Sequence, residues 1–167
     1  MASASMPSLL DPSPADRVIV ALDVPSVGEA LAAVERLDQI TFFKVGLQLF
    51  LTGELPKLLD ALRGKKVFVD LKVPGDISNT VAAVIDACVR SGAIFLTVSE
   101  SMPAPIIRSA LAARNAHGSS VPKLLTVPFV SSLGQADLTE MGSDEEVESY
   151  IVSRAKRAVD AGCEGII

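Results

Sequence analysis

The sequence has no tryptophan, and aromatic residues make up only 4% of the chain. Its core must therefore be aliphatic, which suits parallel strands covered by helices better than an aromatic-rich β-sandwich. No apolar run approaches the ~20 residues that a membrane-spanning helix needs. Basic residues are outnumbered by acidic ones, 15 to 20, which argues against a general nucleic-acid-binding protein.

Cysteine and histidine are also scarce. Cys88 and Cys163 lie far apart in apolar segments, which is typical of buried thiols in a reducing compartment. The single histidine, His117, falls in an expected loop. These residues show no metal-ligand spacing, so we expect no metal site.

The amino-terminal segment is rich in serine and proline and lacks the basic and apolar regions of a signal peptide. We expect residues 1–16 to form a flexible tail and the protein to be cytoplasmic. At roughly 100–200 residues per domain, the chain fits a single domain, residues 17–167. No shift in composition marks an internal boundary.

From residue 17 onward, short β-branched runs alternate with amphipathic helical patterns. The runs are nearly continuous apolar segments, as expected for strands buried on both faces. They cover residues 18–23, 40–46, 67–72, 94–99, 124–130 and 164–167. Apolar residues recur at helical spacing within 30–37, 81–88 and 106–111. This alternation predicts βαβ units and a parallel sheet.

Capping signals place several helix ends. Ser26 with Glu29, and Ser143 with Glu146, have the spacing of capping boxes and predict two helix starts, so that residues 144–146 would form a first helical turn. Gly92 and Gly162 stand where helices should end.

Two α/β architectures fit this pattern, an open doubly wound sheet and a (β/α)8 TIM barrel. A dinucleotide-binding sheet has a glycine-rich turn after its first strand, whereas residues 21–26 contain no glycine. The barrel is therefore preferred, with about six of its βα units present. In a barrel, functional residues gather at the carboxyl ends of the strands.

Charged residues do follow this rule. Asp23 ends the first run, Lys44 lies near the end of the second, and Asp70 and Lys72 end the third, with Asp76 in the next loop. Side chains alternate along a strand, so Asp70 and Lys72 share one side. Burying charges costs several kcal/mol per ion unless they are paired. A cluster of such residues therefore indicates a functional role.

An ammonium group held beside a carboxylate in a partly dry site can stabilise a developing carbanion and then protonate it. A carboxylate facing a substrate carboxylate would also disfavour the ground state. Neither step requires a metal or an organic cofactor. The residues therefore indicate proton transfer or carbon–carbon cleavage on an anionic substrate, without naming that substrate.

Several segments resemble orotidine 5'-phosphate decarboxylase, in order from about residue 17 to the carboxyl terminus. They include ALD, FKVG and DLK and cover residues 20–26, 43–50, 68–80, 96–98, 130–132 and 161–167. The resemblance implies a homodimer of (β/α)8 barrels that converts orotidine 5'-phosphate (OMP) to UMP in de novo pyrimidine biosynthesis. It also implies that this decarboxylation uses neither metal nor cofactor.

The resemblance further implies residue roles at the reacting end of the substrate. Lys72 would donate a proton to C6 of the pyrimidine, and Asp70 would lie beside the substrate carboxylate. Lys44 would complete the charge network and contact the ribose.

For the remaining positions, Asp23 would bind a ribose hydroxyl and Ser132 the pyrimidine edge. Asp76, with Thr80 nearby, would reach across the dimer interface into the partner's site.

The chain departs from the family pattern in three places. Three residues, 73–75, separate Lys72 from Asp76 where the family has two, and their Pro-Gly pair predicts a turn that leaves Asp76 in place. Ser99 stands where many members have histidine. The chain also stops in the sixth strand, at Ile167, before the two units that bind phosphate in this family. We therefore expect a carboxyl-terminally incomplete fragment.

Two other functions stay open. One is a sugar-phosphate decarboxylase or lyase of the same barrel superfamily, which shares the Asp-x-Lys core but uses a metal. Residues 43–46 and 76–80 favour the nucleotide enzyme, and magnesium dependence would reverse that preference. The other is a non-catalytic truncated remnant that dimerises or binds a nucleotide.

Overall fold

The computed structural model describes residues 17–167, so the expected tail, residues 1–16, lies outside the described part. The chain divides into two compact units, and the boundary along the sequence falls between Phe68 and Val69. Six strands alternate with helices, and the strand order follows the sequence, β1-β2-β3-β4-β5-β6. No helix in residues 17–167 is long and apolar enough to cross a membrane.

The first unit holds two short parallel strands and three helices. They are β1 (Val20–Ala21), α1 (Val27–Arg36), β2 (Phe42–Gly46), α2 (Leu47–Phe50) and α3 (Leu55–Ala61). Ala21 of β1 stands opposite Lys44 of β2 in the parallel register. Fully buried aliphatic and aromatic side chains, including Phe43 and Leu58, fill the core of this unit.

The predicted start of α1 is confirmed. Ser26 has an extended backbone, and its hydroxyl oxygen accepts a hydrogen bond from the backbone N–H of Glu29 at 3.2 Å. This contact satisfies one of the N–H groups that the first turn of a helix leaves unpaired. The first helical residue, Val27, is fully buried.

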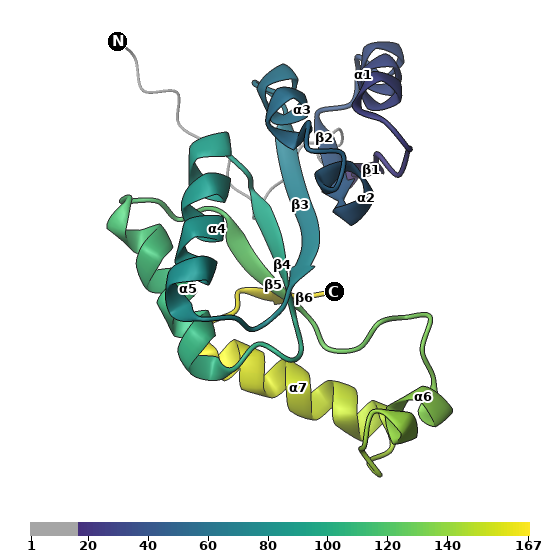
Figure 1. Cartoon of the computed structure of the whole chain (residues 1–167), viewed down its shortest axis with the longest axis vertical. Helices are drawn as coiled ribbons and strands as arrows, with labels where there is room; N and C mark the ends of the chain where they lie inside the picture. Colours follow the sequence, from purple (N-terminus) through teal and green to yellow (C-terminus); the bar gives the residue numbers. More distant parts are fainter. Residues whose placement is uncertain (1–16) are drawn as a thin grey trace. The chain divides into compact units, whose positions relative to one another are not determined.

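Strand β3 (Lys66–Val73) leads into the second unit. That unit contains α4 (Ser78–Ser91), β4 (Phe95–Ser99), α5 (Ala104–Ala116), β5 (Lys123–Val127), α6 (Gln135–Glu140), α7 (Val147–Ala161) and β6 (Gly165–Ile166). Strand β5 pairs in parallel with both β4 and β6. Helix α5 lies beside α4 and also contacts α7 (Figure 1).

Glycine ends two helices of this unit, as the sequence predicts. Gly92 follows α4 with a φ of 73°, and Gly162 follows α7 with a φ of 112°. Both angles lie in the left-handed region, which L side chains adopt only with strain.

The second predicted capping box is wrong. Helix α7 begins at Val147, so residues 144–146 precede the helix, and the Ser143 hydroxyl instead accepts from the N–H of Glu145 at 3.3 Å. The first turn of α7 is capped instead by a side chain from another helix. The side-chain oxygen of Gln135, in α6, accepts from the N–H of Val147 at 3.0 Å, and its amide group donates to the Glu145 carbonyl at 2.9 Å.

A charged cluster ties α5 to the starts of β5 and β6. The Glu164 carboxylate accepts from Arg114 Nη1 at 2.6 Å, from Lys123 Nζ at 2.8 Å and from the Leu124 N–H at 3.2 Å. Arg114 is buried, and the same Nη1 also donates to the Pro122 carbonyl. Burial alone would raise the pKa of Glu164, but these hydrogen bonds outweigh it and lower the pKa.

Both cysteines are buried free thiols, which confirms the expectation from their apolar surroundings. Burial raises the pKa of Cys88 to about 12. Burial and the neighbouring Glu164 carboxylate raise the pKa of Cys163 to about 11. Because the thiolate is the reactive form, these side chains act as small apolar groups.

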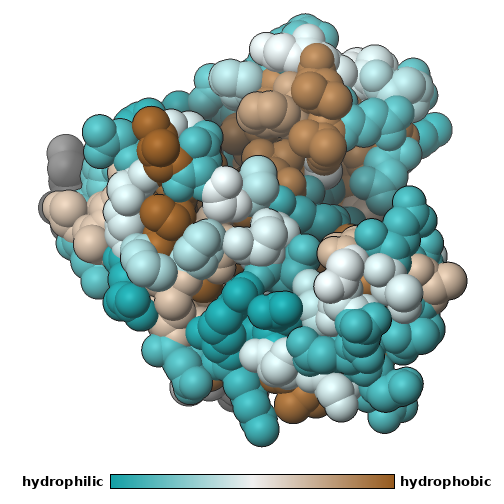
Figure 2. All heavy atoms as spheres, turned by 60° about the horizontal axis from the view of Figure 1, so that its bottom comes forward, coloured by the Kyte–Doolittle hydropathy of each residue, from teal (hydrophilic) through white to brown (hydrophobic). Residues whose placement is uncertain are grey.

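Apolar side chains also reach the surface, where they interrupt a mainly hydrophilic face as separate brown areas (Figure 2). Leu51 is 73% exposed and Ile77 is 69% exposed. Ile77 matters for the site, because it lies in the loop between β3 and α4.

Candidate active site

Asp70 and Lys72 form an ion pair near the end of β3. Lys72 Nζ lies 2.9 Å from Asp70 Oδ1, and the Asp70 side chain is only 11% exposed whereas that of Lys72 is 43% exposed. The carboxylate is thus largely withdrawn from water, and the ammonium group still reaches solvent. This asymmetry suits a proton donor, because the ammonium group can meet a substrate while the ion pair with the carboxylate holds it in position.

The backbone of Lys72 is unusual. Its φ of 47° makes it the one non-glycine residue with a positive φ in residues 17–167. A non-glycine residue in this left-handed conformation costs about 1–2 kcal/mol and persists only where surrounding contacts enforce it. At Lys72 the backbone therefore leaves the regular conformation of a strand, in which residues two apart are separated by about 6–7 Å.

Thr97 of β4 supplies contacts that fix this arrangement. Its side chain is fully buried, and its hydroxyl donates to Asp70 Oδ1 at 2.9 Å. The same oxygen accepts a hydrogen bond from the backbone N–H of Lys72 at 2.8 Å. Thr97 is a site residue that the sequence motifs did not indicate. The available signal was a hydroxyl inside an otherwise apolar strand, since buried polar groups almost always have a partner.

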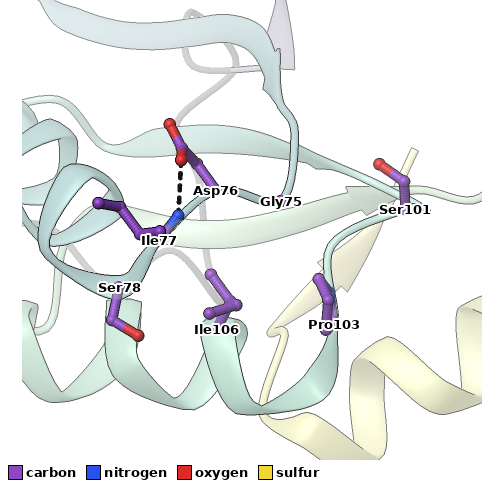
Figure 3. Close-up of a pocket in the computed structure, with 7 residues that line it drawn as sticks. All are labelled: Gly75, Asp76, Ile77, Ser78, Ser101, Pro103 and Ile106. Carbon is purple, nitrogen blue, oxygen red and sulfur yellow. Dashed lines mark hydrogen bonds between the residues drawn. The ribbon is translucent and has the colours of Figure 1, made fainter.

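Asp76 lies on the loop after β3, and Thr80 lies in the first turn of α4. Both are exposed, and Asp76 Oδ1 accepts from the N–H of Ile77 at 2.6 Å. Figure 3 shows the Asp76 carboxylate turned back onto this N–H at the edge of an open pocket of about 670 Å³. The lining residues are Gly75, Asp76, Ile77, Ser78, Ser101, Pro103 and Ile106.

Gly75 lies in the loop that joins β3 to α4, one residue before Asp76. A Cβ atom at this position would lie 2.8 Å from Pro103 Cδ, closer than real contacts allow. The absence of a side chain therefore lets the loop after β3 pack directly against the loop after β4. This contact defines where the Asp76 loop runs.

In the first unit, Asp23 follows β1 and Lys44 lies in the middle of the neighbouring strand, β2. Asp23 is exposed in the loop after β1, and Lys44 is half-buried within β2. A hydrogen bond of 2.9 Å from the N–H of Leu22 to the Lys44 carbonyl joins the two segments. The backbone that carries Asp23 is thus paired with the backbone of Lys44.

Ser99 and Ser132 follow β4 and β5. The Ser99 hydroxyl donates to Glu100 Oε2 at 2.7 Å, and Arg157 of α7 donates to the Glu100 carbonyl. The Ser99 hydroxyl thus makes a local contact with the carboxylate of the next residue. Ser132 is exposed in a turn, two residues beyond Val130.

Comparison with known proteins identifies the family. A family model described as "Orotidine 5'-phosphate decarboxylase / HUMPS family" matches residues 16–167. An orotidine 5'-phosphate decarboxylase of Methylococcus capsulatus is 42% identical over 168 residues, which cover 97% of this chain and 66% of the relative. One from Rhodopseudomonas palustris is 44% identical over 161 residues, covering 94% of this chain and 65% of the relative.

Two solved structures are similar. Orotidine 5'-phosphate decarboxylase from Lactobacillus acidophilus superposes with a TM-score of 0.76 at 32% identity, over 89% of this chain and 69% of that one. An uncharacterized conserved protein from Geobacillus kaustophilus gives a TM-score of 0.81 at 28% identity, over 89% and 71%.

The predicted fold class is confirmed, because six parallel strands alternate with helices as in the TIM-barrel-like fold of the Lactobacillus enzyme. The chain spans about two thirds of the length of the curated relatives that it matches, 66% and 65% for the two described. The family match covers both compact units. The chain belongs to the orotidine 5'-phosphate decarboxylase / HUMPS family.

Proposed function

We propose that this protein decarboxylates OMP to UMP in the cytoplasm, as a step of de novo pyrimidine biosynthesis. The observation that carries the proposal is the Asp70–Lys72 ion pair of 2.9 Å at the carboxyl end of a strand. The names of relatives 42–44% identical to this chain support the choice of substrate within the family.

The proposed reaction breaks the bond between C6 of the pyrimidine and its carboxylate. Carbon dioxide leaves, and the electron pair stays on C6 as a carbanion. The Lys72 ammonium stabilises this charge and then transfers one proton from Nζ to C6, and the amine recovers a proton from solvent. No electron enters or leaves, so the step needs no redox cofactor. We expect no metal requirement either.

Asp70 has two roles in this proposal. Its carboxylate pairs with the Lys72 ammonium group at 2.9 Å and holds that group in place for proton transfer to C6. Facing the substrate carboxylate, it also repels the ground state, and that repulsion disappears once carbon dioxide has left. The low exposure of the Asp70 side chain, 11%, supports both roles because electrostatic interactions strengthen as water is excluded.

The remaining candidates would bind the substrate. We assign Lys44 and Asp23 to the ribose hydroxyls, with Lys44 extending the charge network, and Ser132 to the pyrimidine edge. The positions of Asp23 and Ser132 in the loops that follow β1 and β5 support these assignments, since TIM-barrel sites are built there.

We also propose a homodimer in which Asp76 and Thr80 serve the partner's site. Three observations support it: both residues are exposed, the neighbouring Ile77 is a 69% exposed apolar side chain, and Asp76 lines an open pocket. Mixing the Lys72→Ala and Asp76→Asn variants tests this. If sites are shared, random mixing of two inactive variants restores about a quarter of the wild-type activity. No recovery would contradict a shared site.

The substrate is tested by incubating the protein with OMP and following the ultraviolet change from orotate to uracil. We expect turnover that persists in EDTA and is lost in Lys72→Ala. Activity on a 3-keto-gulonate or hexulose phosphate, dependent on magnesium, would replace the proposal with the sugar-phosphate alternative. No turnover above the Lys72→Ala background on any of these substrates would indicate a non-catalytic chain.

A further inference from the structure

We propose that Thr97 is a positioning residue for the reaction. Its hydroxyl would hold both the carboxylate of Asp70 and the left-handed backbone of Lys72, and so fix the geometry in which ammonium and carboxylate meet. The consequence for activity rests on the proposed function, whereas the structural consequence does not.

The direction of each hydrogen bond around Thr97 is determined. The backbone N–H of Lys72 can only donate, so the Thr97 oxygen accepts at 2.8 Å. An ionised carboxylate can only accept, so the Thr97 hydroxyl donates to Asp70 Oδ1 at 2.9 Å. A single hydroxyl therefore connects the backbone of Lys72 to the side chain of Asp70. Its one hydrogen is donated to the carboxylate, and its oxygen accepts from the N–H.

Asp70 Oδ1 receives two donors. Lys72 Nζ and the Thr97 hydroxyl both lie 2.9 Å from this one oxygen. The Thr97 bond orients the carboxylate, and the oriented carboxylate sets where the ammonium group stands. In the proposed mechanism Thr97 neither contacts the substrate nor transfers the proton. It acts by positioning Asp70 and Lys72.

The backbone of Lys72 needs this partner. At a φ of 47° it departs from the extended conformation of β3, and the Thr97 side chain supplies the acceptor for its N–H. Thr97 is fully buried, so water does not readily replace a missing hydroxyl there. Loss of the hydroxyl would leave this N–H without its acceptor and allow the strand end to relax.

The chain offers a matched control in Thr126 of β5. Thr126 is also a fully buried threonine in a strand, but its hydroxyl has no hydrogen-bond partner in the described part of the chain. Replacing threonine by valine keeps the shape and removes only the hydroxyl. The same substitution thus removes two hydrogen bonds at Thr97 and none at Thr126.

The test compares Thr97→Val, Thr97→Ser and Thr126→Val with the wild-type chain in OMP turnover. We expect Thr97→Val to lower kcat about 10–100-fold with KM within about twofold, because misplaced reacting groups slow chemistry more than binding. Thr97→Ser, which keeps the hydroxyl, should restore kcat to within about threefold, and Thr126→Val should match the wild type. Equal kcat values for Thr97→Val and the wild type would overturn the proposal.

A second readout does not need activity. Amide hydrogen exchange at Lys72, followed by NMR, should be slow in the wild type and in Thr97→Ser, and at least about tenfold faster in Thr97→Val. If the wild type decarboxylates nothing, the proposed function fails while this measurement still tests the role of Thr97. If Thr97→Val does not fold, unprotected exchange at Lys72 in the folded wild type would refute the contact.

Discussion

The left-handed backbone of Lys72 makes a prediction about stability at the centre of the site. We compare Lys72→Gly with Lys72→Ala, since both remove the ammonium group and only alanine retains a Cβ atom. The φ of 47° costs a non-glycine residue about 1–2 kcal/mol, whereas glycine adopts it freely. Glycine in turn loses about 0.5–1 kcal/mol more conformational entropy on folding. The glycine variant should therefore be about 0.5–1 kcal/mol more stable.

Lys123 provides the control, because it opens β5 without a positive φ. There the same pair of variants should reverse in order, with glycine about 0.5–1 kcal/mol less stable than alanine. The difference between the two sites, about 1–2 kcal/mol, isolates the backbone strain at Lys72. Urea unfolding followed by circular dichroism measures all four variants. Glycine destabilising both sites equally would refute the strained conformation.

Three further predictions concern other parts of the molecule. Glu164→Gln should destabilise the chain by about 2 kcal/mol at pH 7, and Asp60→Asn, in an exposed ion pair, by less than about 0.5. Because the pKa of Glu164 is lowered in the folded chain, the difference in free energy of unfolding between the wild type and Glu164→Gln should be full above about pH 5. It should shrink as the pH falls through the folded pKa. A difference that stays constant with pH in urea unfolding would contradict this reasoning. Gly75→Val should displace the Asp76 loop from Pro103 and lower turnover, whereas unchanged crystallographic loop positions would contradict the contact. The Cys88 thiol, with a pKa of about 12, should resist alkylation at pH 8 until the chain unfolds, and rapid labelling of native protein would argue against its burial.

The fold was largely predictable because its strands are short apolar runs between helical patterns. The errors have local causes. The fifth run was expected to continue to residue 130, but β5 ends at Val127, just before Pro128, which has no N–H to donate to a neighbouring strand. The start of α7 was missed because its cap, Gln135, comes from another helix. Contacts between residues far apart in the sequence cannot be detected in the local spacing of apolar residues.

The site was predictable where it depends on alternation along one strand. Placing Asp70 and Lys72 on the same side of β3 required only the two-residue period, and the structure joins them at 2.9 Å. The left-handed turn at Lys72 was not predictable, because lysine has no preference for a positive φ. The contacts of Thr97 depend on the pairing of β3 with β4, which sequence spacing does not reveal. The catalytic and binding roles of all these residues stay predictions.

The most direct test of the central claim is the rate of carbon dioxide release from carboxyl-labelled OMP by the wild type and by Lys72→Ala. Loss of the proton donor should lower kcat by about 10²–10⁴-fold, the usual contribution of a positioned general acid. A Lys72→Ala protein that releases labelled carbon dioxide at the wild-type rate would contradict the assignment of the Asp70–Lys72 pair as the catalytic centre.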